Sequence, residues 1–128
     1  MKGLDVLEKF PKAADAIKEF YYGKMIDTMS DDSTIPDEFK AMIRAQAFDN
    51  EYLATFIDTN PRFLFDLMDV NEIIVQTPSV WVEGAVQFGY TIERKNVDTI
   101  GSSETYSYRN IAEGIAMEKA IEYLNNQL

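Results

Sequence analysis

The chain contains no cysteine and no histidine among its 128 residues. The absence of thiols excludes disulfides, thiolate nucleophiles, cysteine-ligated zinc and iron–sulfur clusters. The absence of imidazole excludes Ser-His-Asp triads, histidine general bases and histidine-ligated metals. Catalysis would have to depend on carboxylates, lysine, tyrosine, hydroxyl groups or an oxygen-ligated metal ion, and no pattern of these residues predicts an enzyme.

The sequence also lacks a long apolar run. No stretch of about 18 apolar residues is present, so we expect no membrane span. Charged residues at Lys2, Asp5 and Glu8 interrupt the apolar start of the chain, which is not typical of a secretory signal. We therefore expect a cytoplasmic protein.

No motif predicts a cofactor or a metal ion. Gly84 and Gly89 have the glycine spacing of a phosphate loop, but Tyr90 and Thr91 follow where Lys and Ser or Thr would be required. The acidic residues between positions 66 and 72 lack the glycine and the residue order of a calcium loop. We therefore expect neither a cofactor nor a metal site.

Acidic residues are abundant, with 22 Asp and Glu against 12 Lys and Arg and a net charge of −10. The excess lies in residues 27–104, which hold 15 acidic residues and five basic ones. Such a charge repels nucleic acid and anionic membranes, so we expect neither as a direct partner. It favours a protein partner with a basic surface, although acidity that serves only solubility is the simpler interpretation.

The length and patterning of the sequence predict an α+β protein of one domain, residues 1–128. A helical half of about residues 1–70 precedes a hairpin-plus-helix half of about residues 72–128. We expect the N-terminal helices to pack on a small antiparallel hairpin or three-stranded sheet, with the C-terminal helix laid across it.

The helical half predicts five helices from apolar spacing and end signals. Pro11 predicts a break after Phe10, between a short helix and a longer one. A Thr34–Asp37 capping box, an Asp49 cap and the pair Asn60-Pro61 then mark the starts of three more. The side chains expected to face inward are Phe39, Met42 and Ile43, then Leu53, Phe56 and Ile57, then Phe63, Leu64, Leu67 and Met68.

A short strand at Ile73–Val75 precedes the main predicted strand, which runs from Val80 to Glu93. Period-two alternation places Val80, Val82, Val86, Phe88, Tyr90 and Ile92 on the buried face. Trp81 falls on the polar face. It points to solvent if the alternation continues through Gly84, and into the core if a bulge occurs there; we favour the core.

The second strand is expected from Val97 to Ser102 after a hairpin tip at Arg94-Lys95, with Ser103–Tyr106 returning antiparallel. Ser107 is expected to cap the last helix, whose inner stripe includes Met117, Ile121 and Leu124. Gly114 within this helix predicts close approach to a strand or another helix, because it lowers helix stability by about 1 kcal/mol relative to Ala.

The last helix begins with Ser107-Tyr108, continues through alanines at positions 112, 116 and 120, and ends with Ile121-x-x-Leu124. Together with the aromatic-rich hairpin before it, this pattern resembles a module in small uncharacterised proteins of bacteriophages and gut bacteria. The resemblance covers at most the last 50 residues and implies a viral or mobile-element protein. It carries over no site residue.

The candidate binding residues are Trp81, Glu83, Tyr106 and Tyr108, because aromatic side chains with a polar group are frequent interface anchors. The leading hypothesis is a non-enzymatic, acidic protein-binding module that binds or inhibits a host factor, in the host cytoplasm if viral. Two alternatives remain: a virion or assembly component that self-associates into a homo-oligomer, and a small-ligand or nucleotide-binding protein.

Overall fold

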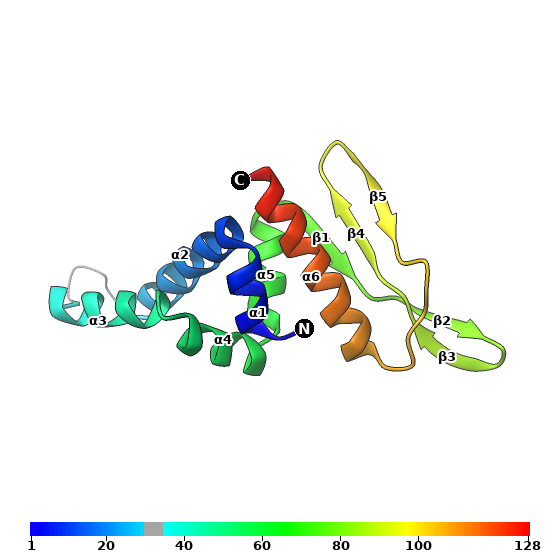
Figure 1. Ribbon diagram of the computed structural model, residues 1–128, viewed down its shortest axis with the longest axis horizontal. Coiled ribbons are helices and arrows are strands. Elements are labelled where there is room, and N and C mark those ends of the chain that lie inside the picture. Colours follow the sequence, from blue (N-terminus) through cyan, green and yellow to red (C-terminus); the bar gives the residue numbers. More distant parts are fainter. Residues whose placement is uncertain (30–34) are drawn as a thin grey trace.

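The computed structural model describes residues 1–29 and 35–128 and confirms the α+β class. Figure 1 shows α6 between the other helices and the strands, with α3 at one end of the molecule and the β2–β3 hairpin at the other. The elements are α1 (Gly3–Lys9), α2 (Pro11–Asp27), α3 (Asp37–Ala47), α4 (Asn50–Thr59), α5 (Arg62–Val70), β1 (Ile73–Gln76), β2 (Ser79–Val82), β3 (Ala85–Phe88), β4 (Thr91–Arg94), β5 (Val97–Gly101) and α6 (Arg109–Gln127).

The helix boundaries follow the predicted end signals. Phe10 separates α1 from α2, and Pro11 is the first residue of α2. The Asp49 carboxylate caps α4 by accepting hydrogen bonds from the backbone N–H groups of Glu51 and Tyr52. The predicted polar loop and its Thr34 cap lie outside the described residues.

The buried core draws on both halves of the chain. It includes Phe63, Leu64, Leu67 and Met68 of α5, all four of which were predicted to face inward. Sequence patterning was wrong for Phe39 and Met42, which are exposed. Their helix, α3, packs against α2 and α4 at the end of the molecule, and nothing described covers its outer face (Figure 1). The largest fully buried side chains are Ile17, Leu53, Ile57, Leu64, Met68, Ile73, Ile92, Ile121 and Leu124.

Strands β1, β4 and β5 form an antiparallel three-stranded sheet in the order β1-β4-β5. Helix α6 packs on β1 and β4, and α5 packs on β1. Ile73, Val75 and Ile92 are buried beneath these helices. Arg94 at the end of β4 is not a freely solvated tip residue, since its guanidinium lies 4.0 Å from the centre of the Tyr123 ring of α6.

The predicted strand from Val80 to Glu93 is wrong, because three strands occupy this stretch. A turn at Glu83-Gly84 separates β2 from β3, and Gly89 and Tyr90 separate β3 from β4. The predicted return of Ser103–Tyr106 is reduced to a single antiparallel bridge between Tyr106 and Phe88.

The start of α6 also differs from its prediction. Tyr108, not Ser107, occupies the N-cap position, and no side chain caps this helix. The predicted close approach at Gly114 is present, but its neighbour is the first residue of the chain rather than a strand or a helix. A Cβ at Gly114 would lie 3.3 Å from the Met1 backbone nitrogen.

Candidate functional site

The β2–β3 hairpin extends away from the helices and is the most exposed strand pair of the fold (Figure 1). Its strands pair antiparallel from Ser79 opposite Phe88 to Val82 opposite Ala85. The two turn residues, Glu83 and Gly84, have φ angles of 51° and 81°. Positive φ at both central residues is the requirement of a type I′ turn, whose twist matches that of the flanking strands. The hairpin is therefore a regular structure with a tight tip.

Trp81 stands at the centre of this hairpin and is 77 % exposed. The interpretation that a bulge turns it into the core is wrong, because β2 and β3 pair without any shift of register. Its cross-strand partner is Val86, which is 45 % exposed on the same face. Val80 points to the opposite face and is 37 % exposed. Apolar side chains therefore meet solvent on both faces.

The predicted burial of Val80 and Val86 fails for a geometric reason. Pairing across a two-residue turn joins residues of opposite parity, as in Trp81 with Val86. The alternation in the sequence therefore changes faces at the turn, and Val86 lies beside Trp81 instead of beside Val80 and Val82. The signal for the turn was present in the sequence, since Glu83-Gly84 lies between two apolar runs.

The base of the hairpin is fixed to the rest of the fold. Phe88 and Tyr106 each donate a backbone N–H to the other's carbonyl at 2.8 Å. The Gly89 N–H donates to the Pro78 carbonyl at 3.1 Å. The guanidinium of Arg109 lies 4.8 Å from the centre of the Phe88 ring. These contacts set the direction of the hairpin and leave its tip free.

The structure does not bring the four predicted binding residues into one cluster. Glu83 lies at the tip, and Tyr106 lies beside Phe88 at the base. Strand β3, with four residues, runs between these two ends and is about 13 Å long at the usual rise per residue. Tyr108 is 65 % exposed at the start of α6. Only Trp81 and Glu83 share the projecting part of the hairpin.

Tyr106 differs from a fully solvated tyrosine in its ionisation. Partial burial raises the pKa of its hydroxyl, and the negative charge of Glu104 and the neighbouring Tyr90 raise the pKa further. The neutral phenol is therefore the stable form of this side chain at the base of the hairpin. Its backbone, through the bridge to Phe88, holds the hairpin in place.

The surface around Trp81 is too shallow for a small ligand. A hollow lined by Ser79, Val80, Trp81 and Val86 has a volume of about 70 Å³. Ligand pockets usually measure about 300–1,000 Å³. The projecting indole is therefore better suited to enter a pocket on a larger molecule than to form a ligand pocket of its own.

The projecting part of the hairpin carries negative charge, whereas its base contacts the Arg109 guanidinium. No Lys or Arg occurs between Gln76 and Glu93, whereas Glu83 lies at the tip and Glu93 on β4. Within residues 1–29 and 35–128, no group of three or more Asp and Glu could hold a metal ion. Nor is any helix in that part of the chain long and apolar enough to cross a membrane.

No protein-family model, no curated protein and no solved structure matches this chain.

Proposed function

We propose that this chain is a non-enzymatic protein-binding module that docks through the β2–β3 hairpin, with Trp81 as its anchor. The observation that carries the proposal is the 77 % exposure of Trp81 on a two-stranded hairpin, where no described element packs over the ring. Tryptophan is among the residues most enriched at binding hot spots, where it fills a pocket on the partner. An isolated two-stranded hairpin is marginal in water, so a partner that covers it adds stability as well as contact.

The chemistry of the hairpin suggests the kind of partner. It offers an apolar knob and a carboxylate at its tip, on a chain whose net charge is −10. The complementary surface is an apolar pocket bordered by Lys or Arg side chains. A phage-like setting is part of the proposal, and it rests on the resemblance of at most the last 50 residues to small phage and gut-bacterial proteins. In that setting, the partner is a bacterial host protein that this chain binds or inhibits in the host cytoplasm.

The test is affinity capture from bacterial lysate with three matched chains: the original, Trp81→Ser and Val70→Ser. Val70 is an exposed apolar residue at the end of α5, outside the hairpin, and serves as the control. We expect a stoichiometric protein to bind the original chain and the control, and Trp81→Ser to lose about 2 kcal/mol or more of binding free energy. Raising the salt concentration should weaken capture, because the flanking charges are exposed.

Failure to capture any stoichiometric protein would contradict this function. Equal capture by Trp81→Ser would show that another surface binds the partner. Both outcomes can be read directly, because the hairpin contributes little to the buried core and the Trp81 variant should fold.

A second candidate is self-association, and the outer edge of β2 favours it. Among the described strands, β2 pairs only with β3, so its other edge is open. Ser79–Val82 carries none of the charges or prolines that usually protect an edge strand. Antiparallel pairing of two copies along β2 would keep the two Glu83 side chains at opposite ends. Light scattering at high concentration tests this. A monomeric original chain, or an oligomer that Val80→Lys leaves intact, would contradict it.

A further inference from the structure

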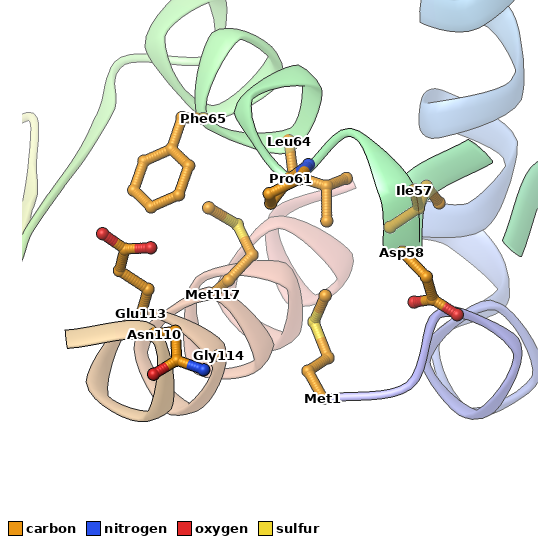
Figure 2. Close-up of a pocket in the computed structure, with 10 residues that line it drawn as sticks. All are labelled: Met1, Ile57, Asp58, Pro61, Leu64, Phe65, Asn110, Glu113, Gly114 and Met117. Atoms are coloured by element: carbon orange, nitrogen blue, oxygen red, sulfur yellow. The ribbon is translucent and has the colours of Figure 1, made fainter. Parts of the chain in front are cut away.

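The cavity that α4, α5 and α6 border does not specify a ligand. Its volume is about 320 Å³, and Met1 lines it together with Asp58 and Glu113 (Figure 2). The Met1 α-ammonium lies against Gly114, so positive and negative groups border the same space and favour neither a cation nor an anion. The outer edge of β2 is more specific, because the groups that it leaves unpaired are those of a polypeptide backbone.

The register of the hairpin determines which backbone groups of β2 are unpaired. A two-residue turn closes on a hydrogen-bonded pair, here Val82 with Ala85, and non-hydrogen-bonded and hydrogen-bonded pairs then alternate along the strands. Trp81 and Ser79 belong to the non-hydrogen-bonded pairs. Their N–H and C=O groups therefore point away from β3, and no described residue pairs with them.

Two contacts at the base of the hairpin fit this alternation. The Gly89 N–H donates to the Pro78 carbonyl across the hairpin, as a hydrogen-bonded pair requires. Phe88, opposite Ser79, instead directs its N–H and C=O outward to Tyr106. The outer edge of β3 is thus closed at its base, whereas no described strand pairs with the outer edge of β2 (Figure 1).

The side chains beside this edge favour a basic residue on whatever pairs with it. Trp81 is 77 % exposed, and a residue placed opposite it on an added strand lies on the same face as the indole. Glu83 lies at the near end of β2, and the Arg109 guanidinium lies on the Phe88 ring at the far end. Positive charge is therefore favoured beside Trp81 and Glu83, where the methylene groups of Lys or Arg can also cover the ring.

We propose that β2 takes an extended, lysine- or arginine-bearing segment of its protein partner as a third, antiparallel strand of the hairpin. The N–H and C=O groups of Ser79 and Trp81 exchange hydrogen bonds with the segment, and its basic side chain lies against the Trp81 ring. In strand addition the main-chain hydrogen bonds supply affinity, and the side chains beside them supply specificity. This inference rests on the proposed function, since it names the part of the partner that the hairpin binds.

The probe is an octapeptide of alternating lysine and valine with blocked ends, titrated into the full chain at a concentration where light scattering shows a monomer. With the peptide at about ten times its Kd, amide exchange at Ser79 and Trp81 should slow roughly tenfold, because only the free chain leaves these groups open. Val80 and Val82 already bond to β3, so their exchange should change less.

Methylation of the peptide backbone tests the orientation of the added strand. In an antiparallel pair the residue opposite Trp81 directs its own N–H toward β2. Nα-methylation of the lysines should therefore weaken binding by about tenfold or more, since it removes these donors, whereas Nα-methylation of the valines should be tolerated. An octapeptide of alternating glutamate and valine should bind about tenfold more weakly than the lysine peptide.

Ser79→Pro removes the outward N–H at the edge without changing the charge or the Trp81 ring, and proline is tolerated at the first residue of a strand. It should weaken binding of the lysine peptide by about tenfold, because a carbonyl of the peptide loses its donor. Ser79→Ala is the matched control, which keeps the N–H and should leave the affinity unchanged. Thermal unfolding should confirm that both variants fold.

Strand addition would be overturned if the lysine peptide does not bind at millimolar concentration, if it binds without slowing exchange at Ser79 and Trp81, or if Ser79→Pro and Ser79→Ala bind it equally. Protection of these two amides in the free monomer would also overturn it. The proposed function fails by a different result, the absence of a stoichiometric partner in capture from lysate. A partner captured through Trp81, together with a negative peptide result, would leave the protein-binding function in place and exclude only the added strand.

Discussion

The two β units of this molecule are built from similar sequence and have opposite surroundings. β1, in the three-stranded sheet, alternates between buried and exposed residues, and Ile73 and Val75 lie under the helices. β2, in the hairpin, has three exposed residues and one half-buried residue. Both strands are rich in β-branched side chains, and both pair antiparallel with a neighbour.

The difference lies in what covers each unit. Helices α5 and α6 pack on β1 of the sheet, whereas both faces of the hairpin carry exposed apolar side chains. Alternation of apolar and polar residues therefore predicts that a segment is a strand, but it does not predict whether another element packs on that strand. The sheet contributes side chains to the buried core, and the hairpin presents its apolar side chains to solvent. The predictions that follow test this division.

The largest expected effect separates the two units directly. Ile92 is fully buried in β4, opposite Val75, so Ile92→Ala should lower the free energy of unfolding by about 2–5 kcal/mol. Trp81→Ala removes a larger side chain but should change it by no more than about 0.5 kcal/mol, because the ring is exposed. Urea unfolding of both variants measures the contrast. A Trp81→Ala loss comparable to that of Ile92→Ala would mean that the hairpin is part of the core.

Glycine substitutions address the same contrast through the backbone. Gly84 has φ 81°, so Gly84→Ala places a Cβ in the left-handed region and should destabilise the hairpin by about 1 kcal/mol. Gly23 in α2 has open space where an alanine methyl group would lie, so Gly23→Ala should stabilise the fold by about 0.5–1 kcal/mol.

Amide hydrogen exchange measures which part of the structure Gly84→Ala destabilises. We expect faster exchange confined to the amides of β2 and β3, with the amides of β4 unchanged. Faster exchange throughout the sheet would mean that the hairpin and the core open together.

Much of the helical half could be predicted because its signals are local. Pro11 excludes helical geometry at Phe10, Asp49 supplies the oxygen that the first amides of α4 need, and the spacing in α5 specifies one apolar face. The exposure of Phe39 and Met42 could not be predicted in this way. It depends on the position of α3 at the end of the molecule, where other elements leave its outer face uncovered.

The candidate sites depend still more on tertiary structure. Trp81 was identified from the sequence, but its exposure depends on the tertiary structure. No described element packs over the ring, and the two-residue turn places Val86 of the next strand on the same face as Trp81. The cavity beside Asp58 and Glu113 was not predicted, because these residues are far apart in the chain. They line one cavity only in the folded chain, where α4 and α6 both border it (Figure 2).

Two cation–π contacts provide a smaller test, one in each unit. The Arg94 guanidinium lies 4.0 Å from the Tyr123 ring, joining the sheet to α6, and the Arg109 guanidinium lies 4.8 Å from Phe88 at the hairpin base. Double-mutant cycles with Arg→Met and aromatic→Leu changes should give coupling energies of about 1 kcal/mol for the first pair and about 0.5 kcal/mol for the second. Equal couplings would mean that the base of the hairpin is as shielded from water as the sheet.

Stability measured at alkaline pH distinguishes the helical core from the base of the hairpin, because each contains a tyrosine with a raised pKa. Burial raises the pKa of Tyr21 above its usual value of 10.0, and its hydrogen bond with Tyr52 raises the pKa further. The pKa of Tyr106 is also raised, first by burial. In the unfolded chain both phenols ionise as the pH passes about 10, while in the folded chain they stay protonated. The unfolded state is therefore favoured above that pH, and stability falls as the pH rises further.

The two tyrosines should differ in how much each contributes to the decline of the free energy of global unfolding at high pH. The raised pKa of Tyr21 disfavours its ionisation while the helical core stays folded, so Tyr21→Phe should flatten the decline of the free energy of unfolding above pH 10. Tyr106 lies at the base of the hairpin, which we expect to open independently of the core. Such local opening would allow the Tyr106 hydroxyl to ionise without global unfolding. Tyr106→Phe should therefore leave the global decline unchanged. If urea unfolding between pH 9 and 11 shows equal flattening by both variants, the hairpin base opens only with the core, and the division between the two units does not extend to that point.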